Sequence, residues 1–177
     1  MNGIEVVNGT EYYKEAFQWA LDKKLTIIGN SDVHAPMPNF TPGKHRAITL
    51  VFARNRSIEA IHDALKERRT AVYHNEQIIG EEKYLKELFE NALEIKVEKT
   101  TNSARITIKN NSELTFHLKK TNHDPRLVYF REYSIVPNGE QSFAVRFQDG
   151  VAGGDVNFSV ENFLVAPNKG MRYTIKL

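Results

Sequence analysis

The chain of 177 residues contains no cysteine. Disulfide bonds, thiolate zinc sites and cysteine nucleophiles are therefore excluded, while the redox compartment stays open. Apolar residues never run for the roughly 18 positions that a membrane-spanning helix needs. An excess of one charge sign is also lacking, since 24 basic and 22 acidic residues give a net charge of +2. This balance gives no basis for predicting nucleic-acid binding.

The hydrophobic content of 41% is enough for a packed core, and the length suits one large domain or two small ones. The hydrophobic pattern changes near Leu93, which favours two domains at 1–92 and 93–177. Before this point, strands and helices alternate, and after it helical patterns stop. We therefore expect an α/β domain followed by an all-β domain.

The first domain is predicted from alternating strand and helix signals. Apolar spacing predicts a helix after the N-cap candidate Thr10, a second one after Ser57 and a third one ending at Ala92. Runs rich in β-branched residues predict strands at 3–7, 25–29, 47–52 and 70–73. This order is typical of βαβ units, so we expect a mainly parallel sheet.

The second domain shows period-two alternation separated by turn-rich segments. Strands are expected at 93–97, 104–108, 114–118, 126–130, 142–147, 156–160 and 172–177. Breaks such as Asn110-Asn111-Ser112 are interpreted as turns. Short strands at this spacing predict a small antiparallel β-sandwich.

One segment carries chemistry, because Asp32 and His34 follow directly on the buried strand 25–29. Parallel α/β folds place their sites at the carboxyl ends of strands. Asp supplies a hard oxygen ligand and His a nitrogen suited to zinc, iron or manganese. In an extended segment, residues two apart point to the same side and can face one metal cluster. The alternative is structural: Asp32 ends the strand in an Asx-type turn and His34 is half exposed.

The wider context resembles a known family. Gly29-Asn30-Ser31-Asp32-Val33-His34 matches a Gly-x-Ser-Asp-x-His pattern, and it is followed by His45-Arg46 and by a strand that contains Thr49. Over roughly residues 1–80, this order resembles the closing segment of PHP-domain proteins. These are the metal-dependent phosphoesterases of the polymerase and histidinol phosphatase family.

The resemblance implies the C-terminal portion of a distorted (β/α)7 PHP barrel, followed by an Ig-like accessory domain. It implies that Asp32 is a ligand of one divalent ion and His34 of another, in a cluster of two or three zinc, manganese or iron ions. Such a cluster hydrolyses a phosphate ester with a metal-activated water. His45 and Arg46 are then candidates for contacting the substrate phosphate, and a solvated loop is the equal alternative for them.

The chain also departs from this family. It lacks the opening His-x-His motif and the intermediate Glu and His ligands. His62 is expected to be a surface or helix-packing residue, and His74 a loop residue. We therefore expect a C-terminal fragment with weak metal binding and little activity alone. Such a fragment should form a homo-oligomer or depend on a missing N-terminal half.

A second hypothesis is a non-catalytic binding or tethering module, in which the β-sandwich recognises a glycan, an anion or a protein partner. Its candidate surface combines basic and aromatic residues: Lys119, Lys120, Arg126, Arg131, Tyr129, Phe130 and Tyr133. Aromatic residues in such strands more often belong to the sandwich core, and we favour that interpretation. The appended sandwich and the absence of cysteine favour a bacterial periplasmic location over a cytoplasmic one.

Overall fold

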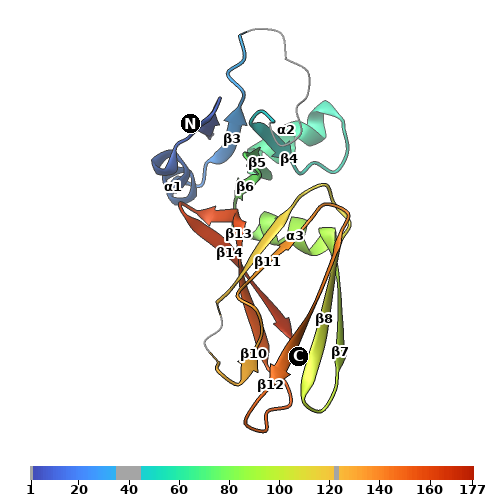
Figure 1. Ribbon diagram of the computed structural model, residues 1–177. Helices are drawn as coiled ribbons and strands as arrows, with labels where there is room; N and C mark the ends of the chain where they lie inside the picture. The colour runs from blue at the N-terminus through green and yellow to red at the C-terminus, as the bar shows by residue number, and fades with distance from the viewer. Residues whose placement is uncertain (1, 35–44, 122–123) are drawn as a thin grey trace. The chain divides into compact units, whose positions relative to one another are not determined.

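The computed structural model describes residues 2–34, 45–121 and 124–177. They form two compact units: Met1–Lys86 with Phe163–Lys169, and Glu87–Asn162 with Gly170–Leu177. The chain is thus a mixed α/β region followed by an antiparallel β domain (Figure 1). The sequence pattern places the division at residue 92. In the structure, the boundary lies between Lys86 and Glu87, inside a helix. The segment Phe163–Lys169 also belongs to the first unit, because its first two residues pair with a strand of that unit.

Up to residue 92, the described residues form three helices and six strands. In chain order they are β1 (Gly3–Asn8), β2 (Glu11–Tyr12), α1 (Lys14–Lys23), β3 (Thr26–Asn30), β4 (Ile48–Val51), α2 (Ile58–Lys66), β5 (Thr70–His74), β6 (Gln77–Gly80) and α3 (Glu82–Ala92). Ser57 caps α2 as expected, because its hydroxyl accepts a hydrogen bond of 3.1 Å from the Ala60 amide. The proline-bearing loop at 35–44 lies outside the described residues.

The pairing in this unit is mixed, whereas the sequence favours a mainly parallel sheet. β1 and β3 pair in parallel, and β6 pairs in parallel with Phe163 and Leu164 of β13 (Asp155–Ala166). β4, β5 and β6 form an antiparallel meander. The turn between β5 and β6 has left-handed backbone at Asn75 and Glu76, which is the conformation of a tight hairpin.

Helix α1 begins later than Thr10 predicts. β1 reverses at Asn8-Gly9, with φ +59° at Gly9, and the chain returns as β2. The pairing of Val7 with Tyr12 and of Asn8 with Glu11 keeps these residues extended. The cross-strand hydrogen bonds therefore outweigh the local helix signal, and the helix begins at Lys14.

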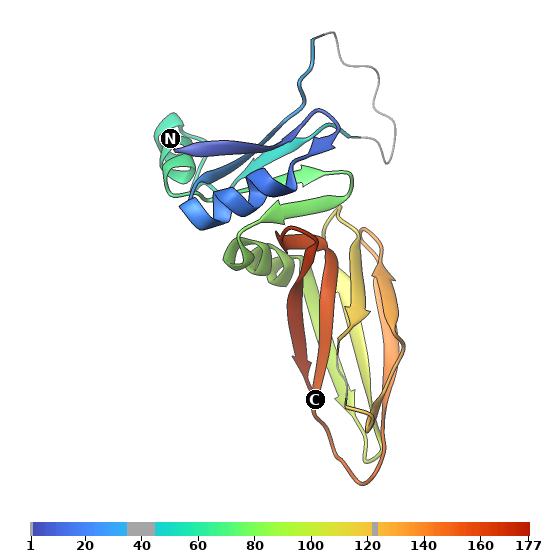
Figure 2. The same ribbon diagram turned by 90° about the vertical axis from the view of Figure 1, so that its left-hand side faces the viewer.

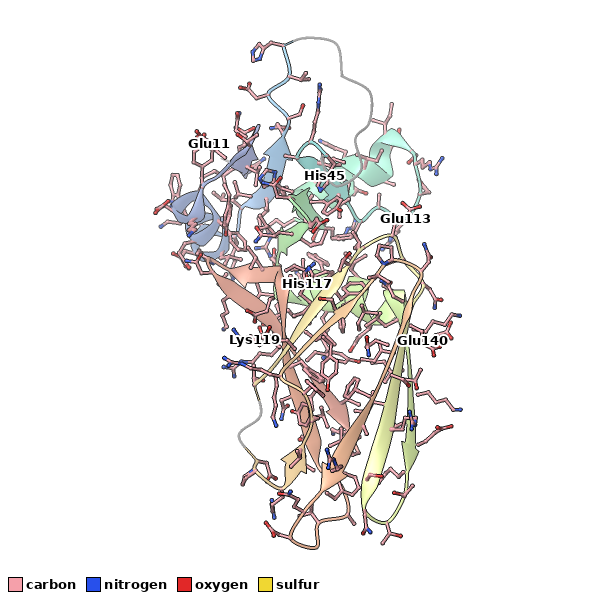
Figure 3. All side chains as sticks on the ribbon, viewed as in Figure 1. Glu11, His45, Glu113, His117, Lys119 and Glu140 are labelled. Atoms are coloured by element: carbon pink, nitrogen blue, oxygen red, sulfur yellow. The ribbon has the colours of Figure 1, made fainter. Side chains whose placement is uncertain are left out.

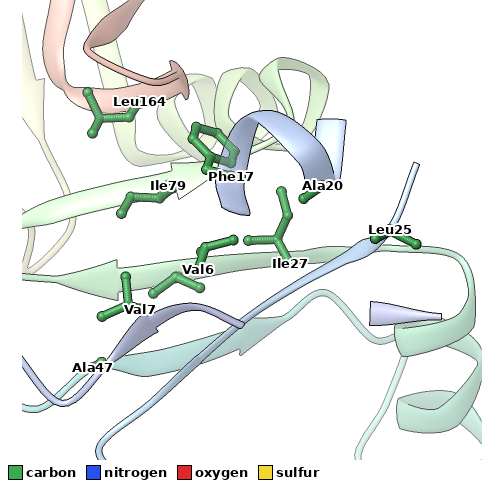
Figure 4. Close-up of a cluster of buried hydrophobic side chains, with 10 residues drawn as sticks. Val6, Val7, Phe17, Ala20, Leu25, Ile27, Ala47, Ile79 and Leu164 are labelled. Carbon is green, nitrogen blue, oxygen red and sulfur yellow. The ribbon is translucent and has the colours of Figure 1, made fainter. Parts of the chain in front are cut away.

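The core of the first unit lies between α1 and the strands (Figure 4). Its central residues are Phe17 and Ala20 on the helix, against Val6 and Ile27 on the two parallel strands. All four are at most 2% exposed. Burying an aromatic or branched side chain to this degree contributes about 1.5–3 kcal/mol each. Phe17 and Ala20 therefore mark the face of α1 that packs on the sheet.

Gly29 lies in this core and ends the buried part of β3. Its amide donates to the Thr49 hydroxyl at 2.9 Å, and that hydroxyl donates to the Gly29 carbonyl at 2.8 Å. A Cβ atom at position 29 would lie 2.4 Å from Cγ1 of Val72. This contact is too short, so the position has no room for a larger residue.

We expect Gly29→Ala to lower the free energy of unfolding by about 1–3 kcal/mol, as overpacked cores do. The measurement is urea denaturation followed by the fluorescence of Trp19, the single tryptophan, which lies on α1. Val72→Ala removes the methyl groups concerned, so the double variant should lose less stability than the sum of the two single variants. Simple additivity would contradict the steric explanation.

The second unit is an antiparallel sandwich (Figure 2). Its strands are β7 (Leu93–Lys99), β8 (Ser103–Asn110), β9 (Phe116–Lys120), β10 (Leu127–Val128), β11 (Glu132–Ile135), β12 (Glu140–Phe147), the first part of β13, and β14 (Lys169–Lys176). One sheet has the order β10-β12-β8-β7. In the other, β9 lies between β11 and β13, and β14 pairs with β13. The antiparallel sandwich that the period-two pattern predicts is therefore present.

The aromatic residues near position 130 divide between core and surface. Tyr133 stacks on Phe143 with ring centroids 4.1 Å apart, and both rings meet Phe158 edge-on. Burial raises the pKa of Tyr133 to about 12. Phe130, in contrast, is 80% exposed. Among the described residues, no helix is both long and apolar enough to cross a membrane.

Candidate metal and phosphate site

The candidate site lies where β1 and β3 end side by side. Asn8 pairs with Asn30 in parallel register, so both strands finish at the same edge of the sheet. The Gly9 amide donates to the Asn30 carbonyl at 2.9 Å, which holds the two strand ends together. The sequence places Asp32 and His34 immediately beyond this edge, and the structure shows how they lie there.

Asp32 adopts a left-handed backbone conformation with φ +48°. The segment is therefore not extended as expected, and the His34 ring folds back on Asp32. Nδ1 of His34 lies 2.8 Å from the Asp32 carbonyl oxygen, and Nε2 lies 3.9 Å from Oδ1 of Asp32. A carbonyl oxygen only accepts, so Nδ1 carries the hydrogen, and in the neutral ring Nε2 keeps its lone pair. The two side chains are 55% and 83% exposed, so both are accessible to a ligand.

A carboxylate network supports the same edge. Glu5 on β1 accepts hydrogen bonds from the side-chain amides of Asn8 at 3.1 Å and of Asn30 at 2.5 Å. It therefore ties the end of β3 to β1, two residues before Asp32. Glu5 is not among the site residues predicted from the sequence. The available signal was a charged residue inside a β-rich run, but its partner Asn30 is 25 positions away and is brought near by the strand register.

The hydroxyl of Tyr13 donates to Glu11 at 2.9 Å. This hydrogen bond is the main reason that the Tyr13 pKa is raised, and the charges of Glu5 and Asp32 add to the shift. Three carboxylates therefore influence one hydroxyl at this edge. Carboxylate oxygens such as these are ligands that divalent cations accept.

His45 and Arg46 precede β4 and lie beside the end of β5, since β4 and β5 are antiparallel. The His45 ring stacks on Tyr73 with centroids 3.8 Å apart. Nδ1 of His45 lies 2.9 Å from the Arg46 carbonyl, and Nε2 accepts a long 3.4 Å hydrogen bond from the Glu76 amide. Both ring nitrogens of His45, which is labelled in Figure 3, thus face backbone groups.

Arg46 is half-buried and has no ion-pair partner among the described residues. No hydrogen bond or ion pair in the described part of the chain joins Asp32 or His34 to His45 or Arg46. The structure thus brings the first two residues together, and it places the second two on the neighbouring strand pair.

His74 is the last residue of β5 and is 4% exposed, rather than a loop residue as expected. Its Nε2 lies 2.9 Å from the side-chain amide of Asn75. Burial lowers the pKa of His74, the charge of His45 lowers it further, and the backbone of Thr10 opposes both effects. His62 lies on α2 and is exposed, so the surface alternative holds and the helix-packing one does not.

Within the described residues, no group of three or more His, Asp or Glu side chains is arranged to hold a metal ion. Structural and catalytic ions take three or more protein ligands, or fewer with water and substrate completing the shell. Asp32 and His34 have suitable donor atoms, but they are too few to hold a cluster of ions. The donor atoms of these two residues thus suit a divalent ion, and other groups would have to supply its remaining ligands.

The comparisons with known proteins agree with this picture. Residues 91–176 match the family DUF5001, described as an Ig-like domain. The whole chain matches the crystal structure of a two-domain protein containing a predicted PHP-like metal-dependent phosphoesterase from Bacteroides vulgatus ATCC 8482. The identity is 46%, the TM-score is 0.96, and the match covers 100% of this chain and 53% of that one. This chain thus spans about half of that protein. No curated protein matches.

The resemblance predicted from the Gly29–His34 motif is therefore confirmed. The chain is similar to the C-terminal half of a two-domain protein that contains a predicted PHP-like metal-dependent phosphoesterase, and it carries an Ig-like domain.

Proposed function

Because the chain matches half of a two-domain protein that contains a predicted PHP-like metal-dependent phosphoesterase, we propose that it forms part of a metal-dependent phosphoesterase. In this proposal, residues 1–92 are the C-terminal portion of a distorted (β/α)7 barrel, and residues 93–177 are its accessory domain. The observation that carries the proposal is the full-length match at 46% identity, together with Asp32 and His34 exposed beyond β3.

Asp32 and His34 supply one oxygen and one nitrogen ligand to the divalent ions of this enzyme. When bound, zinc, manganese or iron would supply an activated water and charge stabilisation for phosphate-ester hydrolysis. The hydrogen bond between Nδ1 of His34 and the Asp32 carbonyl leaves Nε2 as the ligating nitrogen. Glu5 holds Asn30 in place, so the backbone that leads to Asp32 is fixed at its strand end.

The substrate is a small molecule with a phosphate ester. Arg46 is the better of the two phosphate candidates, because its guanidinium offers a bidentate fork. Both His45 nitrogens already face backbone groups. The remaining metal ligands come from the other half of a complete enzyme, so this chain alone should bind metal weakly and turn over little substrate.

A Mn²⁺ titration of the chain, followed by paramagnetic broadening of amide resonances, tests the ligands. We expect broadening to be strongest around residues 31–34. The double variant Asp32→Ala, His34→Ala should weaken binding at least about tenfold, since both donor atoms are lost. The matched control is His62→Ala, Asp63→Ala, which removes an exposed Asp and His from α2 and should leave affinity unchanged.

Unchanged affinity in the Asp32, His34 variant would argue against these ligands. Rapid metal-dependent hydrolysis of p-nitrophenyl phosphate by the chain alone would contradict the dependence on a second half.

A further inference from the structure

A groove of about 720 Å³ lies within the second unit, between β11 and β12. It is lined by Phe130, Tyr133, Ser134, Ser142, Phe143 and Arg146, among others. Its volume falls in the range of ligand-binding pockets. The groove is independent of the metal site, because all its lining residues belong to the Ig-like domain.

One wall of the groove is an open strand edge. β12 pairs with β8 from Glu140 to Arg146, but on its other side β10 reaches only Arg146 and Phe147. The Phe147 amide donates a hydrogen bond to the backbone carbonyl of Asn102 on the β8 side, and the Gln148 amide donates one to the backbone carbonyl of Arg126 on the β10 side. Since backbone groups alternate along a strand, Ser142 and Ala144 direct their N–H and C=O groups into the groove.

The opposite wall is a second open edge. β11 pairs with β9 alone among the described strands. The Arg131 carbonyl accepts a hydrogen bond from the backbone amide of Lys120 on β9. By the same alternation, the backbone groups of Glu132 and Ser134 point away from β9. Two rows of backbone donors and acceptors therefore border the groove.

The groove exists because β10 stops early. In register with the Val128–Arg146 pair, Phe130 would lie opposite Ala144. Instead the Phe130 amide donates to the Tyr133 hydroxyl at 3.0 Å, and the chain leaves β12. Among the described residues, one side chain hydrogen-bonds to this edge: the Gln141 side-chain amide donates to the Ser142 carbonyl at 3.1 Å. None of the described strands pairs with β12 at Ser142 and Ala144 on this side.

The stacked rings of Tyr133 and Phe143 line the groove with apolar surface. Phe130 and Val128 also line it and are 80% and 37% exposed. The lining also contains polar side chains, among them Glu132, Gln141 and Arg146. An extended peptide needs backbone partners and pockets for alternate side chains. The open strand edges supply the first, and the stacked rings of Tyr133 and Phe143 supply apolar surface for the second.

We propose that this groove binds an extended peptide segment of a partner protein by strand addition. The segment would pair antiparallel with Ser142 and Ala144 and continue the line of β10. Every second side chain would face Tyr133 and Phe143, so apolar residues are required there. The affinity would come from backbone hydrogen bonds and the specificity from these inward side chains.

The β8 sequence, Ser-Ala-Arg-Ile-Thr-Ile-Lys-Asn, is a defined probe, because it already pairs antiparallel with the other edge of β12. When this peptide lies on the open edge with its isoleucine side chains inward, its residues equivalent to Arg105 and Thr107 lie opposite Ala144 and Ser142. Their backbone N–H groups then point toward β12. N-methylation of these two residues should weaken binding at least about tenfold. N-methylation of the residues equivalent to Ile106 and Ile108 should leave it nearly unchanged.

Binding is followed by amide chemical shifts of the full chain. The largest shifts are expected at Ser142 and Ala144, together with slower exchange of their amides. Ala144→Pro removes the donor that faces the groove and should weaken binding at least about tenfold, whereas Ala144→Thr keeps the donor and should not.

Three results would overturn the proposal. One is absence of binding of the unmodified peptide at about 1 mM. Another is equal binding of both methylated peptides, which would indicate recognition of side chains alone. The third is concentration-dependent pairing of two copies through this edge that the peptide does not displace, because the occupant would then be a second copy.

Discussion

Asp32→Asn is expected to lower metal-dependent phosphoester hydrolysis by at least about 100-fold in an enzyme that contains this chain. The amide is neutral, so it binds a divalent ion more weakly than the carboxylate and does not offset its charge. A suitable enzyme is a fusion in which this chain replaces the matching half of the Bacteroides vulgatus protein. The measurement is kcat/KM for p-nitrophenyl phosphate with Mn²⁺.

Asp63→Asn on α2 is the control, since this residue is exposed on a helix and has no role in the proposed site. It should leave kcat/KM within a factor of about two. A comparable loss in both variants would indicate a folding defect, and normal turnover with Asp32→Asn would exclude Asp32 as a ligand. Absence of metal-dependent turnover in the unaltered fusion would contradict the proposed function itself.

The strongest local patterns predicted the fold elements well. The buried strand at 25–29, the Ser57 cap and the helix ending at Ala92 are all present. Strand β6 was not predicted, because the hairpin before it uses Asn75 and Glu76 in left-handed conformations. Glutamate is an unusual residue there, and the usual hairpin signal is Asn-Gly. No local signal in the sequence therefore indicated the antiparallel meander, and a mainly parallel sheet was predicted instead.

The candidate metal ligands were easier to predict than the residues that hold their backbone in place. Asp32 and His34 are two positions apart, so their proximity follows from the sequence. Glu5 reaches Asn30 only through the parallel register of β1 and β3, and no local pattern contains that register. Likewise, His74 is buried because β5 lies between β4 and β6.

The second large effect is expected in the sandwich. Asn110 ends β8 and is 1% exposed, although the sequence indicated a turn. Its side-chain amide donates to the carbonyls of Leu114 at 2.7 Å and of Val136 at 2.9 Å. Its oxygen accepts from the amide and the hydroxyl of Ser112 at 2.9 and 2.7 Å. This one side chain therefore fixes the two segments that follow β8 and β11.

We expect Asn110→Ala to lower the free energy of unfolding of the second unit by about 3 kcal/mol, because it leaves several of these groups without partners. Hydrogen exchange of the β8 and β12 amides measures this loss. Asn110→Asp keeps the shape and the acceptor but cannot donate, so it should cost at least as much. The neighbouring Asn111 is exposed and its side chain contacts Glu94, so Asn111→Ala should cost less than about 0.5 kcal/mol. Equal losses at the two positions would contradict the role assigned to the buried hydrogen bonds of the Asn110 side chain.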